Sequence, residues 1–288
     1  MIFYLKNSCQ FFGCRRLSIK TTFVPIKILI MTTRFEEFRK LHDNETPLLL
    51  GNVWNVQSAL QYEKLGFKAL GTSSAAIASD LGYEDGENMP FEDYFFMIQR
   101  IKSAVKIPLS VDLEAGYGNS VEEITANISK LYEIGIIGIN IEDSIVVNSK
   151  REITETESFT TQLKAIVESL KKKNIDIFIN VRSDVFLLDL PNKIEESKYR
   201  LKQYEMTGVD GIFLPCITNE NDIKEIAETI KLPLNVMCIP NLPNFERLNE
   251  LGVKRISMGN FVNTFLNKQL GKVTLEVLES NSFSPLFE

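Results

Sequence analysis

Short apolar runs alternate with amphipathic stretches from about residue 47 to the end of the chain. The apolar runs are rich in Leu, Ile and Val. The stretches between them carry apolar residues at helical spacing. Alternation of this kind is typical of strand–helix–strand units, which build a parallel sheet with helices on its faces. The pattern therefore predicts an α/β protein.

Eight such units are predicted in about 225 residues, which matches a (β/α)8 TIM barrel. The expected strands are Leu48–Asn52, Ala69–Thr72, Leu109–Asp112, Gly138–Glu142, Ile177–Val181, Gly211–Leu214, Leu234–Met237 and Arg255–Met258. Helical patterns lie near residues 55–65, 91–104, 120–134, 157–172, 194–207, 220–230, 243–251 and 260–268. A doubly wound open sheet is the alternative, but it would usually place a Gly-rich phosphate turn where Gly51–Trp54 stands.

Composition and charge are those of an ordinary globular protein. Lys and Arg total 32 against 38 Asp and Glu, which gives a net charge of −6. No basic stripe interleaves with aromatic residues, so we expect no nucleic-acid partner. The most apolar stretch, Phe23 to Met31, is broken by Pro25 and Lys27, so we expect no membrane helix and a soluble protein.

The first 35 residues differ from the rest of the chain. They hold six basic residues and no acidic one, which leaves 26 basic and 38 acidic residues, a net charge of −12, for the remainder. We expect residues 1–33 to be either an organelle transit peptide or a segment before a true start at Met31. The barrel domain is expected at 34–270 and a tail at 271–288.

Cysteine usage predicts a reducing compartment. Cys9 and Cys14 lie in the expected leader, and Cys216 and Cys238 have no Cys-x-x-Cys spacing. Neither a zinc site nor a disulfide framework follows. We expect the protein to be cytoplasmic, or to lie in an organelle matrix if the leader is a transit peptide.

Acidic residues follow two neighbouring strands at the end where barrel enzymes carry their active sites. The third strand continues into Asp112 and Glu114, which a period of two would place on one side, and the fourth strand ends at Glu142. Three converging carboxylates repel one another unless a cation neutralises them, and oxygen ligands suit Mg²⁺ or Mn²⁺. The alternative is that these acids are helix caps or surface residues.

Arg182 follows the fifth strand and could hold a substrate carboxylate through two hydrogen bonds. It could instead pair with Asp112 or Glu142 and brace the barrel. After the second strand come small hydroxylated residues, including Ser73 and Ser74, whose backbone amides could hold an oxyanion. Taken alone, this last stretch reads only as a loop.

Several chemistries are disfavoured. No predicted strand carries a lysine inside the barrel for Schiff-base chemistry. The only histidine, His42, precedes the first strand. Cys216 follows the sixth strand, but with no histidine to activate it we expect a packed thiol.

These residues give the chain a resemblance to a known superfamily. Thr72–Ser74, Leu81–Tyr83 with Asp85, Asp112–Asn119, Ile141–Asp143 and Arg182 occur in the order and spacing of the isocitrate lyase/phosphoenolpyruvate mutase superfamily, over about Phe35 to Gln269. The form Asp112-Leu113-Glu114-Ala115-Gly116-Tyr117-Gly118 is similar to its phosphonomutase-like branch.

The resemblance implies a TIM barrel whose last helix is exchanged between subunits, in a homodimer or homotetramer. It implies Mg²⁺ bound mainly at Asp112, with Glu114 and Glu142 acting through water. A small 2-oxo acid would be held by the metal, the Ser73 and Ser74 loop and Arg182. Further expected roles fall on Asp85 at the active-site mouth, a catalytic residue like Arg182, and on Gly116 and Tyr117, which contact substrate.

The loop after the Glu142–Asp143 strand departs from the superfamily lyases. It reads Ser144 to Arg151 and lacks the cysteine that serves those lyases as acid/base. We therefore expect a Mg²⁺-dependent enzyme that breaks a C–C or P–C bond beside a 2-oxo carboxylate through an enolate, on an oxaloacetate-like or phosphonopyruvate-like substrate. The alternatives are a phosphoenolpyruvate phosphonomutase and a barrel that binds a 2-oxo acid without turnover.

Overall fold

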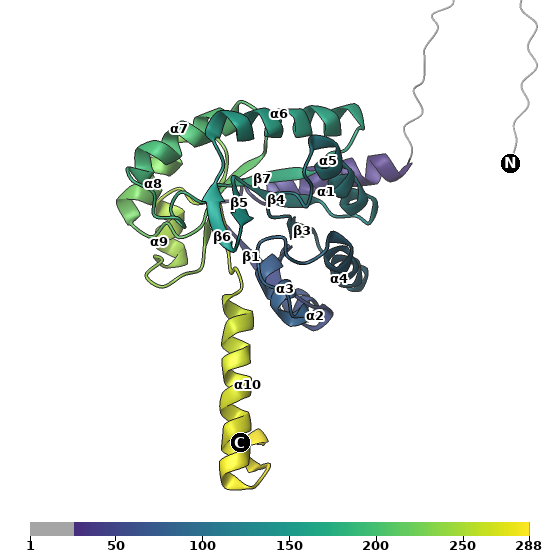
Figure 1. Ribbon diagram of the computed structural model, residues 1–288, viewed down its shortest axis with the longest axis vertical. Helices are drawn as coiled ribbons and strands as arrows, with labels where there is room; N and C mark the ends of the chain where they lie inside the picture. Colours follow the sequence, from purple (N-terminus) through teal and green to yellow (C-terminus); the bar gives the residue numbers. More distant parts are fainter. Residues whose placement is uncertain (1–25, 288) are drawn as a thin grey trace, which may run out of the picture.

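The computed structural model describes residues 26–287 and contains a closed barrel of eight parallel strands (Figure 1). The strands follow one another around the barrel in chain order, from β1 through β4 and then from β7 to β10. They are β1 (Leu48–Val53), β2 (Leu70–Thr72), β3 (Leu109–Asp112), β4 (Gly138–Glu142), β7 (Phe178–Arg182), β8 (Gly211–Leu214), β9 (Leu234–Met237) and β10 (Arg255–Ser257). The predicted TIM barrel is confirmed, with each strand bound correct to within one residue.

Helices surround the barrel strands (Figure 1). They are α2 (Val56–Lys64), α4 (Phe91–Ala104), α5 (Val121–Glu133), α6 (Thr156–Lys172), α7 (Lys193–Glu205), α8 (Glu220–Thr229) and α9 (Phe245–Glu250). In α5 the buried residues Ile124, Ile128 and Leu131 recur at helical spacing. Ser120 begins this helix by accepting a hydrogen bond from the Glu123 amide at 3.2 Å.

Helix α3 (Ser74–Leu81) replaces what the sequence predicted as a loop. Its small residues give no amphipathic pattern, so hydrophobic periodicity could not find it. The Ser73 side chain accepts a hydrogen bond from the Ala76 amide at 3.3 Å and so caps the helix. Gly82 ends it in the left-handed conformation, with φ of 81°.

The loop after β4 is a β-hairpin rather than irregular chain. Strand β5 (Ser144–Val147) pairs in antiparallel register with β6 (Lys150–Ile153). The two turn residues, Asn148 and Ser149, both have positive φ angles, 51° and 61°. Such a two-residue turn follows the twist of the strands and fixes their register.

Helix α1 (Ile26–Lys40) packs on the opposite end of the barrel from this hairpin. Met31 and Phe38 are buried there with residues that begin the strands, such as Leu48 and Phe178. The Phe38 and Phe178 rings meet edge to face at 5.4 Å. The helix crosses the expected domain boundary at residue 33, and the rest of the expected leader, residues 1–25, lies outside the described residues.

Helix α10 (Phe261–Ser280) is longer than the predicted 260–268 and crosses the expected tail boundary at residue 270. It projects away from the barrel body (Figure 1), and Asn263 is its one buried residue. A single 3₁₀ turn, Ser284–Leu286, follows it. Within residues 26–287, none of the helices combines the length and apolar character needed to cross a membrane.

Candidate active site

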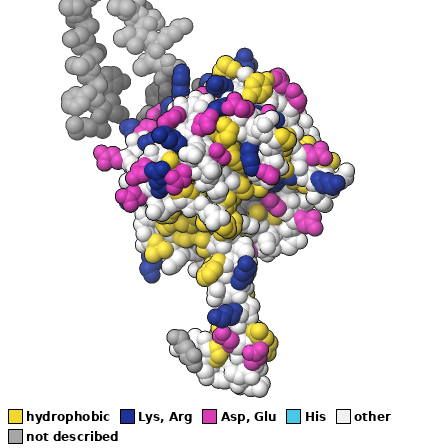
Figure 2. Space-filling view, turned by 90° about the vertical axis from the view of Figure 1, so that its left-hand side faces the viewer, with side chains coloured by type: hydrophobic (Ala, Val, Ile, Leu, Met, Phe, Trp, Pro, Cys, Tyr) yellow, Lys and Arg dark blue, Asp and Glu magenta, His cyan; other side chains and the backbone are white. Residues whose placement is uncertain are grey.

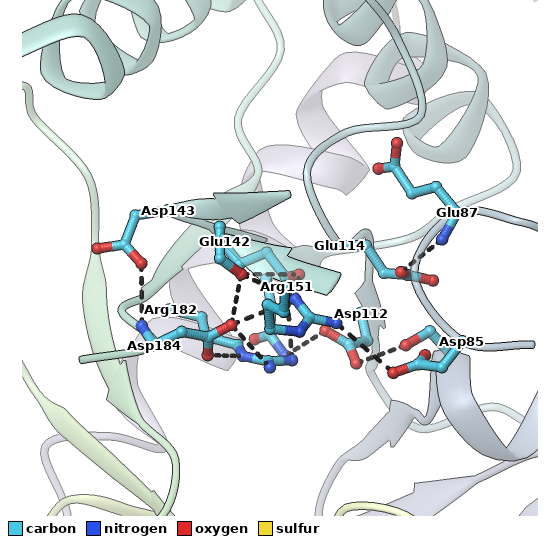
Figure 3. Close-up of polar contacts among 12 residues, drawn as sticks. Asp85, Glu87, Asp112, Glu114, Glu142, Asp143, Arg151, Arg182 and Asp184 are labelled. Atoms are coloured by element: carbon cyan, nitrogen blue, oxygen red, sulfur yellow. Dashed lines mark hydrogen bonds and ion pairs between the residues drawn. The ribbon is translucent and has the colours of Figure 1, made fainter. Parts of the chain in front are cut away.

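Charged side chains meet at the carboxyl ends of three neighbouring strands (Figure 3). Asp112, Glu142 and Arg182 are the last residues of β3, β4 and β7. Strand β4 lies between the other two, with Glu142 beside Arg182 in register and Asn140 beside Asp112. Parallel pairing therefore places the three side chains at one mouth of the barrel.

Asp112 is half-buried and held by neutral groups. Its two carboxylate oxygens accept hydrogen bonds from Ser74 Oγ at 3.0 Å and from Asn140 Nδ2 at 3.2 Å. The Tyr94 hydroxyl donates to the Asp112 backbone oxygen at 2.7 Å. No cation forms an ion pair with this carboxylate among the described residues, although its charge contributes to raising the pKa of the nearby Arg182.

Glu114 reaches the same cluster by a different route from the one predicted. Strand β3 ends at Asp112, so alternation does not extend to Glu114, whose φ of 50° places it in a left-handed turn. Its buried carboxylate accepts hydrogen bonds from the Tyr117 hydroxyl at 2.9 Å and the Glu87 amide at 2.8 Å. The turn, and not strand periodicity, aims this acid at the mouth.

Gly116 and Tyr117, which also belong to the predicted site, shape the turn that carries Glu114. Gly116 has a φ of 117°, and a Cβ there would lie 2.8 Å from Ile124, so both backbone and space require glycine. Asn127 donates to the backbone oxygens of Gly116 and Tyr117 at 3.2 and 2.6 Å. Gly116 and Tyr117 thus hold Glu114, and Tyr117 contacts it directly.

The acids in this half of the site raise one another's pKa. Burial, followed by the charges of Asp85, Glu142 and Asp112, raises the pKa of Glu114 to about 9. Desolvation and the charge of Asp112 raise the pKa of Asp85 as well. Like charges in a low-dielectric mouth favour either protonation or a bound cation.

Arg182 is paired on both sides. Its Nη1 lies 2.8 Å from Glu142 Oε2, and its Nε lies 2.6 Å from Asp184 Oδ1. Burial opposes the charge of this guanidinium, but Glu142 and Asp184 raise its pKa further above the usual range. These contacts match the bracing interpretation of Arg182 for Glu142.

Asp184 and Arg151 are site residues that the sequence analysis missed. Asp184 is fully buried and accepts from Ser144 Oγ at 2.5 Å as well as from Arg182. Arg151, from β6, donates through Nη1 to Glu142, and its Nη2 lies 3.6 Å from Asp85 Oδ2. Arg151 could have been found only by pairing residues 144–147 with residues 150–153 across the turn at Asn148 and Ser149, which places Arg151 opposite Val146.

A further buried acid, Asp143, links the end of β4 to the residues that follow β7. Asp143 accepts hydrogen bonds from Ser183 Oγ at 2.7 Å, the Asp184 amide at 2.9 Å and the Tyr204 hydroxyl at 2.9 Å. The Arg200 guanidinium adds a contact at 3.4 Å. This fully partnered network fixes the backbone that carries Glu142 and Asp184.

The barrel interior beneath the site is polar. Asn180 Nδ2 donates to Asn140 Oδ1 at 2.9 Å, and Asn140 in turn donates to Asp112. The buried Arg255 reaches Asn140 Oδ1 at 3.4 Å. The acceptor side of the Asn140 amide is therefore taken, which leaves its donor side for Asp112 and orients that carboxylate.

The other predicted residues have separate places. Ser73 is buried as the cap of α3, whereas Ser74 contacts Asp112 directly. Asp85 lies at the rim, with 48% of its side chain exposed. His42 is buried against Phe178, with ring centroids 4.4 Å apart, and burial lowers its pKa to about 3, so it is a core residue.

Comparisons with known proteins agree with this architecture. The family model described as phosphoenolpyruvate phosphomutase matches residues 38–278. An uncharacterised protein of Mycobacterium tuberculosis is 30% identical over 77% of this chain and 81% of its own length. An oxaloacetate decarboxylase of Paraburkholderia xenovorans is 27% identical over 70% of this chain and 68% of its own.

A solved structure supports the same relationship. A protein from Burkholderia cenocepacia J2315, provisionally described as a phosphonomutase, is 31% identical, with a TM-score of 0.80 over 85% of this chain and 99% of that one. The family match covers far more than half of the sequence. The chain therefore belongs to the phosphoenolpyruvate phosphomutase family, within the phosphoenolpyruvate mutase/isocitrate lyase superfamily.

Proposed function

We propose that the protein is a Mg²⁺-dependent enzyme that breaks a bond to C3 of a 2-oxo carboxylate, with an oxaloacetate-like substrate. The observation that carries this proposal is the meeting of an acid-only cluster with the guanidinium of Arg182 at one barrel mouth. Related sequences include 2-methylisocitrate lyase of Shewanella oneidensis, 28% identical, and the oxaloacetate decarboxylase above. These relatives make a lyase reaction the first to test.

The residues present suit a divalent cation. Asp112, Glu114 and Glu142 offer carboxylate oxygens, the ligands that Mg²⁺ and Mn²⁺ prefer. The pKa of Glu114 is raised first by burial and then by the neighbouring acids, and a bound cation would offset both. Within residues 26–287, no three His, Cys, Asp or Glu side chains lie close enough together to bind one metal ion directly. We therefore assign a single direct contact to Asp112 and contacts through water to Glu114 and Glu142. Bound Mg²⁺ would supply Lewis-acid polarisation of the 2-oxo group.

The protein's own residues then have distinct tasks. Arg182 binds the substrate carboxylate and stabilises negative charge that develops on the neighbouring oxygen. Ser74 holds Asp112 in orientation. When the bond from C3 to the leaving carboxylate breaks, its electron pair moves towards the 2-oxo oxygen, and CO₂ departs. Asp85, whose pKa is raised by burial and by the charge of Asp112, is the acid that returns a proton to C3.

The hairpin after β4 favours decarboxylation over the lyase reactions of the superfamily. It carries Arg151 but no cysteine, and it holds no histidine. Cleavage of a hydroxylated C–C bond needs a base to remove the hydroxyl proton, whereas loss of CO₂ needs only an electron sink and a later proton. The similarity to a protein described as a phosphonomutase keeps a phosphonopyruvate-type P–C cleavage as the second candidate.

A substrate panel tests this proposal. Oxaloacetate, phosphonopyruvate, 2-methylisocitrate and acylpyruvates are each assayed with Mg²⁺ and with EDTA. We expect turnover of oxaloacetate that requires Mg²⁺, and turnover of phosphonopyruvate alone would favour the second candidate. If ligands raise the melting temperature but none is consumed, the protein is a 2-oxo acid binding barrel and the proposal is wrong.

We also propose that α10 is exchanged between subunits of a homodimer or homotetramer. Exposed apolar side chains run along it, including Phe265, Leu266 and Leu270. A groove of about 570 Å³ lies at its base, lined by Trp54, Tyr62, Val262 and Leu266 among others. Figure 2 shows hydrophobic side chains on the barrel body beside the base of α10. A compact monomer in solution scattering would contradict this assembly.

A further inference from the structure

Arg151 is the part of the site that the proposed reaction leaves without a task. Its side chain starts from the hairpin, outside the barrel, yet only 15% of it is exposed. The guanidinium Nη1 donates to Glu142 and to Ser144 Oγ, the latter at 2.8 Å, and lies 3.2 Å from Asp184 Oδ2. Figure 3 shows it between the acids of the two sides of the mouth.

Glu142 consequently has a guanidinium on each carboxylate oxygen. Arg182 contacts Oε2, and Arg151 contacts Oε1. Arg182 belongs to barrel strand β7 and is tied to Asp184 two residues later, so its position is fixed by the barrel. The backbone of Arg151 belongs to the hairpin and not to a barrel strand, so of the two cations Arg151 is the one that could leave Glu142 without moving the barrel.

The hairpin docks on the mouth through one face. Ser144, Val146, Arg151 and Ile153 point inward and are at least partly buried, whereas Ile145, Val147, Lys150 and Glu152 are exposed. Val146 meets the loop after α3 so closely that a Cβ on Gly86 would lie 2.4 Å from it. The docking contact therefore combines one ion-pair cluster with one tight apolar contact.

We infer that Arg151 is a tethered counter-ion that competes with a divalent cation for the charge of Glu142 and its neighbours, so that metal binding weakens the docking of the hairpin. The inference rests on the proposed metal site at Asp112, Glu114 and Glu142. Two cations beside one buried carboxylate repel each other, and each lowers the benefit that the other gains there. By linkage, the factor by which bound metal weakens hairpin docking equals the factor by which docking weakens metal binding.

Calorimetric titration with Mg²⁺ alone tests this on the full chain. Arg151→Gln is expected to bind Mg²⁺ about 10-fold more tightly than the wild type, because one positive charge has left the mouth. Lys150→Gln is the matched control. It removes the same charge from the preceding residue, which is exposed and has no ion-pair partner among the described residues. We expect the Mg²⁺ affinity of this variant to change by less than about 2-fold.

Amide hydrogen exchange of residues 144–153 in the wild type gives a second measurement that does not depend on the variant folding. Saturating Mg²⁺ is expected to speed exchange in the hairpin by about 10-fold, the same factor as above. Unchanged or weaker Mg²⁺ affinity in Arg151→Gln, or a hairpin that Mg²⁺ protects, overturns the inference and leaves the proposed function standing. No Mg²⁺ binding to either chain overturns both.

Discussion

The two sides of the barrel mouth contain similar acids but balance them differently. On one side Glu142 and Asp184 are buried and each contacts Arg182 and Arg151. On the other side Asp112 and Glu114 are held by a serine, an asparagine, a tyrosine and a backbone amide. The first side is a set of ion pairs, and the second is a set of acids stabilised by neutral donors.

This difference gives the two sides unequal weight in stability, although both supply residues to the proposed reaction, Glu142 and Arg182 from the paired side and Asp112 and Glu114 from the other. Removing one partner of a buried ion pair strands the other charge, so the paired side contributes to the fold. Removing an acid from the other side relieves repulsion, so those acids are retained at some expense of stability. Residues that a fold would be more stable without are the ones to expect in binding and catalysis.

The largest expected effect follows loss of the proposed direct metal contact. Asp112→Ala should reduce Mg²⁺-dependent turnover of oxaloacetate by about 10³-fold, since several kcal/mol of charge stabilisation are lost. Mg²⁺ titration by calorimetry with oxalate, a mimic of the enol product, measures the binding itself. A well-folded Asp112→Ala protein with unchanged Mg²⁺ affinity would remove the basis of the acid-only side as a metal site.

On the paired side the effect should fall on stability instead. Asp184→Ala leaves Arg182, Arg151 and Ser144 without their shared acceptor, and we expect the free energy of unfolding to fall by about 3–5 kcal/mol. Urea unfolding in EDTA measures it. The matched variant is Asp112→Ala, which should lower stability by only about 1 kcal/mol, because relief of repulsion among the acids offsets part of the cost of leaving the Ser74 and Asn140 donors without an acceptor. Equal losses in the two variants would mean that the sides do not differ.

Substrate binding should depend on the shape of one side chain. Arg182→Lys keeps a positive charge beside Glu142 but loses the second hydrogen bond to a carboxylate. We expect KM for oxaloacetate to rise about 10 to 100-fold, with Mg²⁺ affinity within about 2-fold of the wild type. Steady-state kinetics and calorimetry check the two parts. A rise in KM that is matched by a loss of Mg²⁺ affinity would show that Arg182 acts through the metal site.

Taken per pH unit, the smallest effect concerns the pH dependence of stability. Burial raises the pKa of Glu114 from 4.5 to about 9, so the folded protein binds a proton that the unfolded chain releases between these values. Stability in EDTA should therefore fall as pH rises from about 5 to 9, by at most about 1.4 kcal/mol per pH unit from this group. Glu114→Gln should flatten the slope.

Two further measurements sharpen that result. Glu122→Gln, on the exposed start of α5, should leave the slope as it is. In the presence of Mg²⁺, Glu114→Gln should bind the metal about 10 to 100-fold more weakly, as expected for a contact made through water. A slope that persists in Glu114→Gln would assign the proton to another acid of the mouth.

The barrel could be predicted because its strands are short, apolar and regularly separated. The eight strands consist mainly of buried residues, so apolar runs mark them directly. Helix α3 escaped because Ser74–Leu81 is made of small residues that face both the barrel and solvent without a clear stripe. Helix α10 was predicted too short because a projecting helix has no buried face in its own chain to set its length.

The site was predictable where side chains sit on strand ends and obscure where they sit on turns. Asp112, Glu142 and Arg182 follow from parallel register. Glu114 was expected near Asp112 for the wrong reason, since a left-handed turn places it. Arg151 lies in a hairpin that folds back over the mouth, and its contact with Glu142 is visible only in the three-dimensional structure.

The close approach of Gly86 to Val146 constrains how this mouth can change during evolution. Any side chain at position 86 would meet the Val146 methyl groups and push the hairpin outward, carrying Arg151 away from Glu142. Gly86 also has a φ of 94°, a conformation that side chains rarely adopt, so a shorter residue at position 146 would relieve the contact but not the backbone strain. A mouth of new shape therefore requires changes in the hairpin and in the backbone of the loop after α3 together.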